Sequence, residues 1–287
     1  MDLKISEALV SAGLTAGEKV KKIYYKGDLG LLDNKKIKLA IVGSRKMTDY
    51  GRRVIEQMVP VLVQAGVVIV SGYMYGVDQA SHENCLDCGG ETIAVLGWGI
   101  DRELSIEDER LYEKFKKGRS LIMSEYYGKA MAERYYFVQR NRIVVGISDA
   151  VLVVEAAEKS GTMTSVRWAK KMNKPVLCVP GQITSKVSEG VNGLLKSGEA
   201  KMVTGVDDIL KALNLAPGQM EIDLGVRPLI GVAPLVLMLE EEPEGMEVDR
   251  LAKLVKKPAS AVMAELTKLE ILGQVEQRGG KFFLKNI

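Results

Sequence analysis

The stretch Ile37-Lys-Leu-Ala-Ile-Val-Gly-Ser-Arg45 runs from a short apolar segment directly into a glycine, a serine and an arginine. Short apolar runs that alternate with longer amphipathic stretches are typical of buried parallel strands joined by crossover helices. We therefore predict an α/β domain in which helices flank a parallel sheet. Five further apolar runs end in loops of glycine, serine or charged residues: Val67–Val70, Thr92–Leu96, Ser120–Met123, Ala150–Val154 and Pro175–Val179.

Size and composition indicate a cytoplasmic protein with about two domains. The chain has 287 residues, and one hydrophobic core typically serves about 100–200 residues. No apolar run approaches the roughly 20 residues that a membrane span needs, so we expect no membrane contact. The first residues lack the layout of a secretory signal.

The chain divides by composition into four parts. Residues 1–36 form a short N-terminal extension, helical to about Tyr24 and extended over 26–29. Residues 37–213 form the α/β core, and the Pro/Gly-containing stretch 214–227 reads as a linker. Residues 228–287 predict a winged helix, with helices over 234–240, 247–255 and 259–272. A hairpin follows, with strands over 274–277 and 281–285 around Arg278-Gly-Gly280.

The loops after the predicted strands meet at one edge of the sheet, where ligands of such folds bind. Gly43, Ser44 and Arg45 combine close backbone approach, a hydroxyl and a forked cation, which suits a phosphate. A tight turn with a surface arginine explains the same tripeptide. Ser71 and Gly72 indicate a second, weaker cradle, which is neither a Walker loop nor a dinucleotide fingerprint.

Two further segments add cations to this edge. Ser160 and Gly161 precede a helix that carries Lys170 and Lys171, which indicates either a second anion site or ordinary helix capping. The segment Phe137-Val-Gln-Arg140-Asn141-Arg142 mixes rings with guanidinium groups. That mixture suits single-stranded nucleic acid, although a core helix would also explain it. Between residues 134 and 174 the chain carries eight basic residues against three acidic ones. Such a cluster is a hint of polyanion binding.

The cysteines and the histidine do not predict a metal site. His82, Cys85 and Cys88 fall in a stretch that should be helical, where they spread over more than a third of the circumference. A structural zinc needs four convergent ligands. We expect reduced structural cysteines, no metal and no disulfide, Cys178 included.

Taken in order and with their spacing, these motifs resemble the DNA processing protein A family (DprA, also called Smf). The resemblance implies a Rossmann-like core that binds single-stranded DNA as a homodimer, without a cofactor or catalytic residues. It implies that the protein protects incoming strands and helps to load the RecA recombinase in natural transformation and recombination. The motifs are Lys26–Leu29, Ile41–Arg45, Tyr50-Gly51, Ser71-Gly72, Gly76–Asp78, Thr92–Gly97, Ser124-Glu125, Arg140–Ile143, Val154–Ala156, Ser160-Gly161, Pro180-Gly181 and Gly190–Asn192.

The resemblance also implies roles for the motif residues. Gly43, Ser44 and Arg45 would hold backbone phosphate, while Ser160, Gly161 and Lys170 or Lys171 would form the opposite lip. The strand's path would be lined by Phe137, Arg140, Asn141 and Arg142. Departures from the family pattern, such as Met47 in place of a proline, leave open whether the task is transformation or another single-strand process.

Two other functions remain open at this point. A nucleotide-processing enzyme like the Lonely Guy phosphoribohydrolases would carry a Pro-Gly-Gly-x-Gly-Thr-x-x-Glu loop, but here Glu155 precedes Ser160-Gly161-Thr162. A duplex-DNA regulator would bind through the winged helix. Recognition helices normally bring a basic surface, whereas residues 225–287 carry nine basic and nine acidic groups.

Overall fold

The computed structural model describes residues 20, 22–215, 235, 238–239, 242, 245–255, 258–271 and 275–284. The chain forms two compact units, Met1–Met220 and Glu221–Ile287. The predicted linker 214–227 lies almost entirely outside the described residues, so its boundaries stay a prediction.

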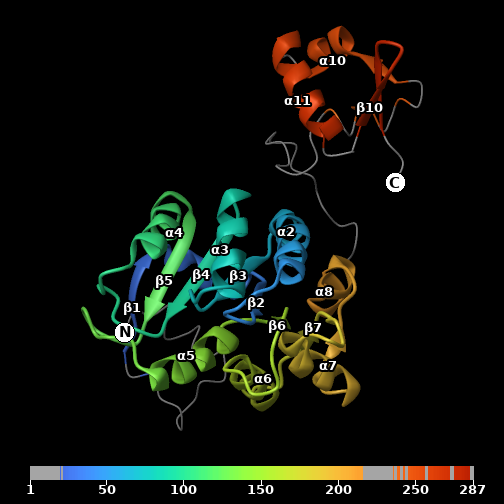
Figure 1. The fold of residues 1–287 in the computed structure, drawn as a ribbon. Helices are drawn as coiled ribbons and strands as arrows, with labels where there is room; N and C mark the ends of the chain where they lie inside the picture. Colours follow the sequence, from blue (N-terminus) through green and yellow to red (C-terminus); the bar gives the residue numbers. More distant parts are fainter. Residues whose placement is uncertain are drawn as a thin grey trace. The chain divides into compact units, whose positions relative to one another are not determined.

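An eight-stranded sheet forms the centre of the first unit (Figure 1). Its spatial order is β1-β5-β4-β3-β2-β6-β7-β8, and every neighbouring pair is parallel except β1 and β5. The strands are β1 (Tyr24–Gly27), β2 (Lys38–Val42), β3 (Val68–Ser71), β4 (Glu91–Leu96), β5 (Arg119–Ser124), β6 (Ala150–Val153), β7 (Val176–Cys178) and β8 (Lys201–Met202).

All six strands predicted from the apolar runs are present, each within one residue of the predicted bounds. The two edge strands were not predicted as strands, and of the residues 26–29 that were expected to be extended only 26 and 27 lie in β1. Strand β1 is mostly exposed and polar, and β8 has only two residues, so neither leaves an apolar run in the sequence. Tyr24 begins β1 instead of ending a helix, so the predicted helix boundary is wrong. Residues 1–19 lie outside the described part of the chain.

Helices cover both faces of the sheet (Figure 1). One face packs against α2 (Asp49–Gln64), α3 (Val77–Asp87), α4 (Ile106–Lys117) and α8 (Val206–Ala212). The other face packs against α5 (Arg134–Gly146), α6 (Thr162–Lys171) and α7 (Glu189–Lys196). Two short 3-10 helices, η1 (Leu29–Leu32) and η2 (Lys186–Ser188), complete the unit. Within the described residues, no helix is both long and apolar enough to cross a membrane.

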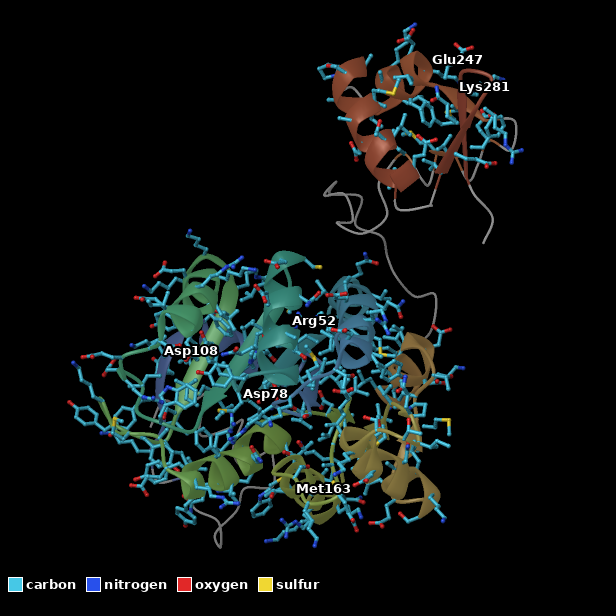
Figure 2. All side chains as sticks on the ribbon, viewed as in Figure 1. Arg52, Asp78, Asp108, Met163, Glu247 and Lys281 are labelled. Carbon is cyan, nitrogen blue, oxygen red and sulfur yellow. The ribbon has the colours of Figure 1, made fainter. Side chains whose placement is uncertain are left out.

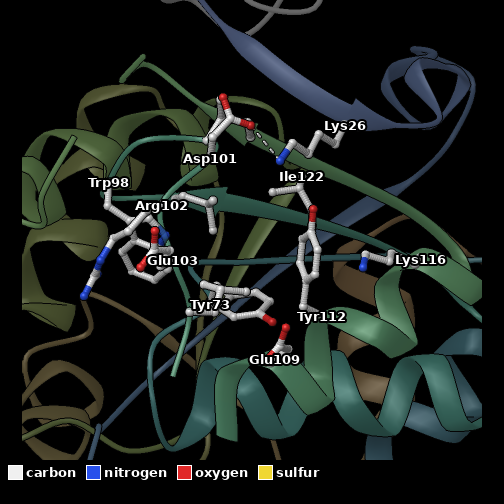
Figure 3. Close-up of a pocket in the computed structure, with 13 residues that line it drawn as sticks. Lys26, Tyr73, Trp98, Asp101, Arg102, Glu103, Glu109, Tyr112, Lys116 and Ile122 are labelled. Atoms are coloured by element: carbon white, nitrogen blue, oxygen red, sulfur yellow. Dashed lines mark ion pairs between the residues drawn. The ribbon is translucent and has the colours of Figure 1, made fainter. Parts of the chain in front are cut away.

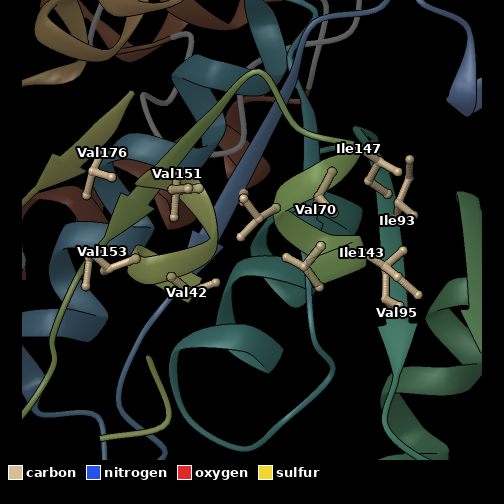
Figure 4. Close-up of a cluster of buried hydrophobic side chains, with 14 of the residues drawn as sticks. Val42, Val70, Ile93, Val95, Ile143, Ile147, Val151, Val153 and Val176 are labelled. Carbon is tan, nitrogen blue, oxygen red and sulfur yellow. The ribbon is translucent and has the colours of Figure 1, made fainter. Parts of the chain in front are cut away.

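Alternation along the buried strands builds two separate cores. In β2, Leu39 and Ile41 face α2 and α3, while Ala40 and Val42 face α5 and α6. Figure 4 shows the second of these layers, where Val42 lies with side chains from β3, β4, β6 and α5. Burying each such aliphatic side chain contributes about 1.5–3 kcal/mol, so the central strands and their loops have a rigid base.

The second unit has the helices and antiparallel wing predicted from its sequence. It contains β9 (Met246–Glu247), α10 (Val248–Val255), α11 (Ala259–Ile271), β10 (Val275–Arg278) and β11 (Lys281–Leu284). The strand order is β10-β11-β9. Leu251, Leu266 and Phe282 meet in its own small core. Of the predicted helix 234–240, residues 235, 238 and 239 are described, and they are helical.

A buried histidine makes the stability of the first unit depend on pH. His82 is the chain's only histidine, and its Nδ1 lies 2.7 Å from the Thr92 hydroxyl oxygen. Burial, with a smaller contribution from Arg140, lowers the pKa of His82 to about 3 from its ordinary value of 6.5. The folded protein therefore holds this ring neutral.

We expect the free energy of unfolding to fall by about 1.4 kcal/mol per pH unit below pH 6.5 from this group alone. The unfolded chain takes up the proton below that pH, whereas the folded chain does so only near pH 3. Urea denaturation at pH 7, 6 and 5 measures the effect. His82→Gln should flatten the dependence between pH 6.5 and 5, and an unchanged slope in that variant would assign the effect to carboxylates.

Candidate functional site

The sheet reverses its winding at β2. The chain proceeds from β2 through β3 and β4 to β5 on one side, then returns to place β6 and β7 on the other. The loops after β2 and β6 therefore lead to α2 and α6 on opposite faces, which opens a crevice between them at the carboxyl ends of the strands. Figure 2 labels Asp78 at the start of α3 and Met163 at the start of α6, one on each face beside this edge.

The loop after β2 is held by its neighbours through its carbonyl groups. The Thr162 hydroxyl donates to the Gly43 oxygen at 3.0 Å, and the Val77 backbone N–H donates to the Ser44 oxygen at 3.2 Å. A Cβ at position 43 would lie 2.5 Å from Val77, so only glycine fits this close approach. Among the described residues, the backbone N–H groups of Ser44 and Arg45 have no hydrogen-bond acceptor. These two amides are therefore available to a ligand.

Arg45 and Phe137 form the exposed contact across this edge. The Arg45 side chain is exposed, and its guanidinium carbon lies 5.0 Å from the centre of the Phe137 ring. Phe137 is half-buried on α5 against Gly97, where a Cβ would lie 2.7 Å from the ring. Trp98 packs edge-to-face on the same ring with centroids 6.0 Å apart. A fixed ring under a cation is a surface on which a base can stack beside a phosphate contact.

Arg140 has a different environment from the one its sequence motif predicts. Its side chain is 3% exposed, donates to the Val95 carbonyl and lies flush against Gly72. Burial lowers the pKa of Arg140 to about 10, while Asp78 opposes that shift. Burial also raises the pKa of the Asp78 carboxyl, which Arg140 partly offsets. Arg140 therefore positions the loop after β3 from below, and it is not on the exposed side of the crevice.

Arg142 is also occupied inside the protein. It is 7% exposed and pairs with Glu125 through two hydrogen bonds of 2.6 Å each. The prediction that Arg142 lines an open strand path does not agree with this burial. Asn141 instead bridges two elements, since its amide donates to the Gly161 oxygen at 3.5 Å. Sequence spacing could not predict which of these side chains are buried, because exposure depends on which face of α5 meets the sheet.

The structure brings part of the predicted opposite lip to the crevice. Gly161 is exposed at the start of α6, and the Ser160 hydroxyl is buried without a partner among the described residues. Lys170 and Lys171 lie in the last turn of α6, at the end away from these residues. Lys170 pairs with Glu199, and Lys171 stacks on Trp168 at 4.9 Å. The structure therefore does not place these lysines beside Ser160 and Gly161, where the resemblance had grouped them.

Ser71 and Gly72 serve the interior as well. The Ser71 hydroxyl is buried and donates to the Ile41 oxygen at 2.6 Å.

Glu155, which follows β6, has a structural role that the sequence did not predict. It is 1% exposed and accepts the Thr48 backbone N–H at 3.0 Å and the Thr48 hydroxyl. A carboxylate at the N-terminus of α2 satisfies the helix dipole. Within the described residues, no group of histidine, cysteine or acidic side chains could hold a metal ion.

These features define a class of protein: a doubly wound α/β domain with an exposed arginine–aromatic pair at its switch point, followed in the chain by a winged-helix unit. Residues 11–214 match the model of the family DNA recombination-mediator protein A, and residues 238–281 match that of the DprA winged helix domain. The chain belongs to the DNA recombination-mediator protein A family.

Individual relatives agree with this assignment. Protein Smf from Synechocystis sp. is 31% identical over 90% of this chain and 73% of its own. The structure of DNA processing protein A from Streptococcus pneumoniae superimposes with a TM-score of 0.61 at 35% identity, covering 66% of this chain and 65% of that one. A structure describing the single-stranded DNA binding mode of DNA processing protein A from Helicobacter pylori gives 0.63 at 33% identity, covering 69% and 89%.

Proposed function

We propose that this protein binds single-stranded DNA at the crevice between β2 and β6, without catalysing a reaction. The observation that carries the proposal is the exposed Arg45 guanidinium over Phe137, beside the two backbone N–H groups without acceptors. Amides and a guanidinium hold phosphate, and a ring stacks a base of any sequence. The single-strand binding described for the Helicobacter pylori relative supports the same activity here.

In this proposal the contacts with the strand come from Gly43, Ser44, Arg45, Phe137 and Gly161. Arg140, Arg142, Ser71 and Gly72 position those groups from the interior. We further propose that the protein acts in the cytoplasm as a homodimer that protects incoming strands and passes them to RecA in natural transformation. If so, it should accelerate RecA filament formation on single-stranded DNA, and an unchanged rate would contradict the RecA step.

Arg45→Ala should weaken binding to oligo(dT) and to mixed-sequence strands by the same factor. It should also reduce the magnitude of the slope of log K against log salt by about 0.7, because one phosphate contact no longer releases its counterions. Fluorescence anisotropy at two or more salt concentrations measures both. Arg119→Ala is the matched control, since Arg119 is an exposed arginine at the amino end of β5. Equal losses in the two variants would count against the crevice.

The absence of catalysis has its own test. Incubation of the protein with nucleoside monophosphates should release no free base. Turnover that survives full purification would favour a phosphoribohydrolase-like activity over the binding function proposed here.

A further inference from the structure

A second hollow lies beside the crevice, between α4 and the sheet. Its volume is about 520 Å³, within the range of small-molecule sites. Three aromatic rings line it from three elements: Tyr73 from the loop after β3, Trp98 from the loop after β4, and Tyr112 from α4 (Figure 3). Neither Arg45 nor Phe137 belongs to its lining. The hollow is therefore distinct from the proposed strand crevice.

The rings are fixed before any ligand arrives. Tyr73 is 2% exposed, and its hydroxyl donates to the Asp108 carbonyl at 2.8 Å. Its backbone has φ of +64°, an uncommon conformation for a tyrosine that brings a strain cost of about 1–3 kcal/mol. Trp98 packs edge-to-face on Tyr73 with centroids 6.3 Å apart. The fold retains this backbone strain and thereby holds the Tyr73 ring at the hollow, which indicates that the ring has a function there.

Polar groups surround the rings, and two of them, Glu109 and Arg102, have no ion-pair partner among the described residues. Lys26 is already paired with Asp101 at 2.8 Å, as the dashed line in Figure 3 marks. Arg102 lies over the Trp98 ring at 5.4 Å. The hollow thus offers a carboxylate that accepts hydrogen bonds and a cation next to an aromatic face.

We propose that this hollow binds a nucleotide, with its base against the half-buried Tyr112, beside the buried rings of Tyr73 and Trp98, and with its phosphate toward Arg102. Glu109 accepts N–H groups from the edge of the base. Guanine presents two neighbouring N–H donors on one edge and thymine presents a single one, so the hollow prefers guanine. Aromatic surfaces combined with a cation and one oriented acceptor suit this ligand better than a purely apolar one.

The nucleotide has two possible sources with the same chemistry. Trp98 contacts Phe137, the ring beneath Arg45, so the hollow adjoins the proposed strand path. A base of the bound strand could enter it, and that source rests on the proposed function. A free nucleotide could bind there as well, and that source does not depend on strand binding.

Tryptophan fluorescence can report on the hollow directly. The chain has two tryptophans, so Trp168→Phe leaves Trp98 as the sole reporter. In that background dGMP should quench the emission saturably, and dTMP should require at least tenfold more ligand. Glu109→Gln should weaken the dGMP response about tenfold or more, because it removes a charged hydrogen-bond acceptor. Glu56→Gln is the control, since Glu56 is an exposed glutamate on α2, outside the lining, and should change nothing.

A second titration separates the two sources. Oligo(dT) with one central dG, compared with plain oligo(dT), should give quenching sensitive to Glu109→Gln if the strand supplies the base. A response to dGMP alone assigns the hollow to a free nucleotide. The proposal is overturned if no nucleotide or strand quenches Trp98 in a protein with unchanged near-UV circular dichroism, or if Glu109→Gln and Glu56→Gln behave alike. Failure of oligo(dT) to bind in anisotropy, with the dGMP response intact, would overturn only the strand function.

Discussion

Replacing Arg142 by alanine is expected to lower the free energy of unfolding by about 3–5 kcal/mol, measured by urea denaturation at neutral pH. Arg142 and Glu125 are paired through two hydrogen bonds of 2.6 Å, and their side chains are 8% and 13% exposed. Removing the guanidinium leaves a carboxylate without a partner in a poorly solvated position. The cost arises mainly from that stranded charge, more than from the lost attraction.

Two controls make this interpretation specific. Lys129→Ala breaks the Lys129–Glu103 pair, whose side chains are 71% and 83% exposed, and should change stability by less than about 1 kcal/mol. The double variant Arg142→Met with Glu125→Leu removes both charges and should recover most of the stability. If the single and double variants are equally unstable, the pair is not the source of the loss.

The double variant also decides between two roles for Arg142. A positioning residue can be replaced together with its partner while the dependence of strand binding on salt stays as in the wild type. A residue that contacts phosphate cannot, because the slope of log K against log salt would fall by about 0.7. Measuring oligo(dT) binding by the stable double variant therefore tests the burial seen here against the role that the motif implies.

The sequence predicted the sheet well because the six central strands are buried on both faces. A strand such as Ala150–Val153 must then be apolar along its whole length, which makes it visible as a run. The edge strand β1 has no such constraint, since only one side of it pairs and most of its residues are exposed. Its antiparallel pairing with β5 depends on contacts distant in sequence, which no local pattern reports.

The positions of the candidate site residues were predicted in part, for a related reason. Gly43 and Arg45 lie at the predicted edge of the sheet because the carboxyl ends of parallel strands share one edge. Residues on α5 were harder, because the helix is covered on several sides. Phe137 remains half-buried at the crevice, whereas Arg140, three residues later, is buried beneath Gly72. The sequence shows that Arg140 is charged. Whether its side chain is solvated depends on the loops that cover it, and no local pattern reports those loops.

Gly76→Ala should be about 3 kcal/mol less stable than the wild type and should weaken strand binding, although residue 76 is not proposed to contact the strand. Gly76 has φ of +79° and ψ of −126°, a backbone conformation that side chains rarely adopt. A Cβ there would overlap the Ser44 carbonyl oxygen and lie 2.7 Å from the Arg45 oxygen. These are backbone atoms, so the loop Gly43–Arg45 must move to make room. Urea denaturation and oligo(dT) anisotropy measure the two effects.

Gly66→Ala separates the conformational cost from the displaced loop. Gly66 has φ of +71°, and a Cβ there meets nothing within 4 Å. That substitution should cost only about 1–2 kcal/mol of backbone strain and leave oligo(dT) affinity unchanged. The difference between the two variants then measures how strongly the loop after β3 fixes the loop after β2. If Gly76→Ala binds like the wild type and is no less stable than Gly66→Ala, the amides of Ser44 and Arg45 are not held in place by this contact.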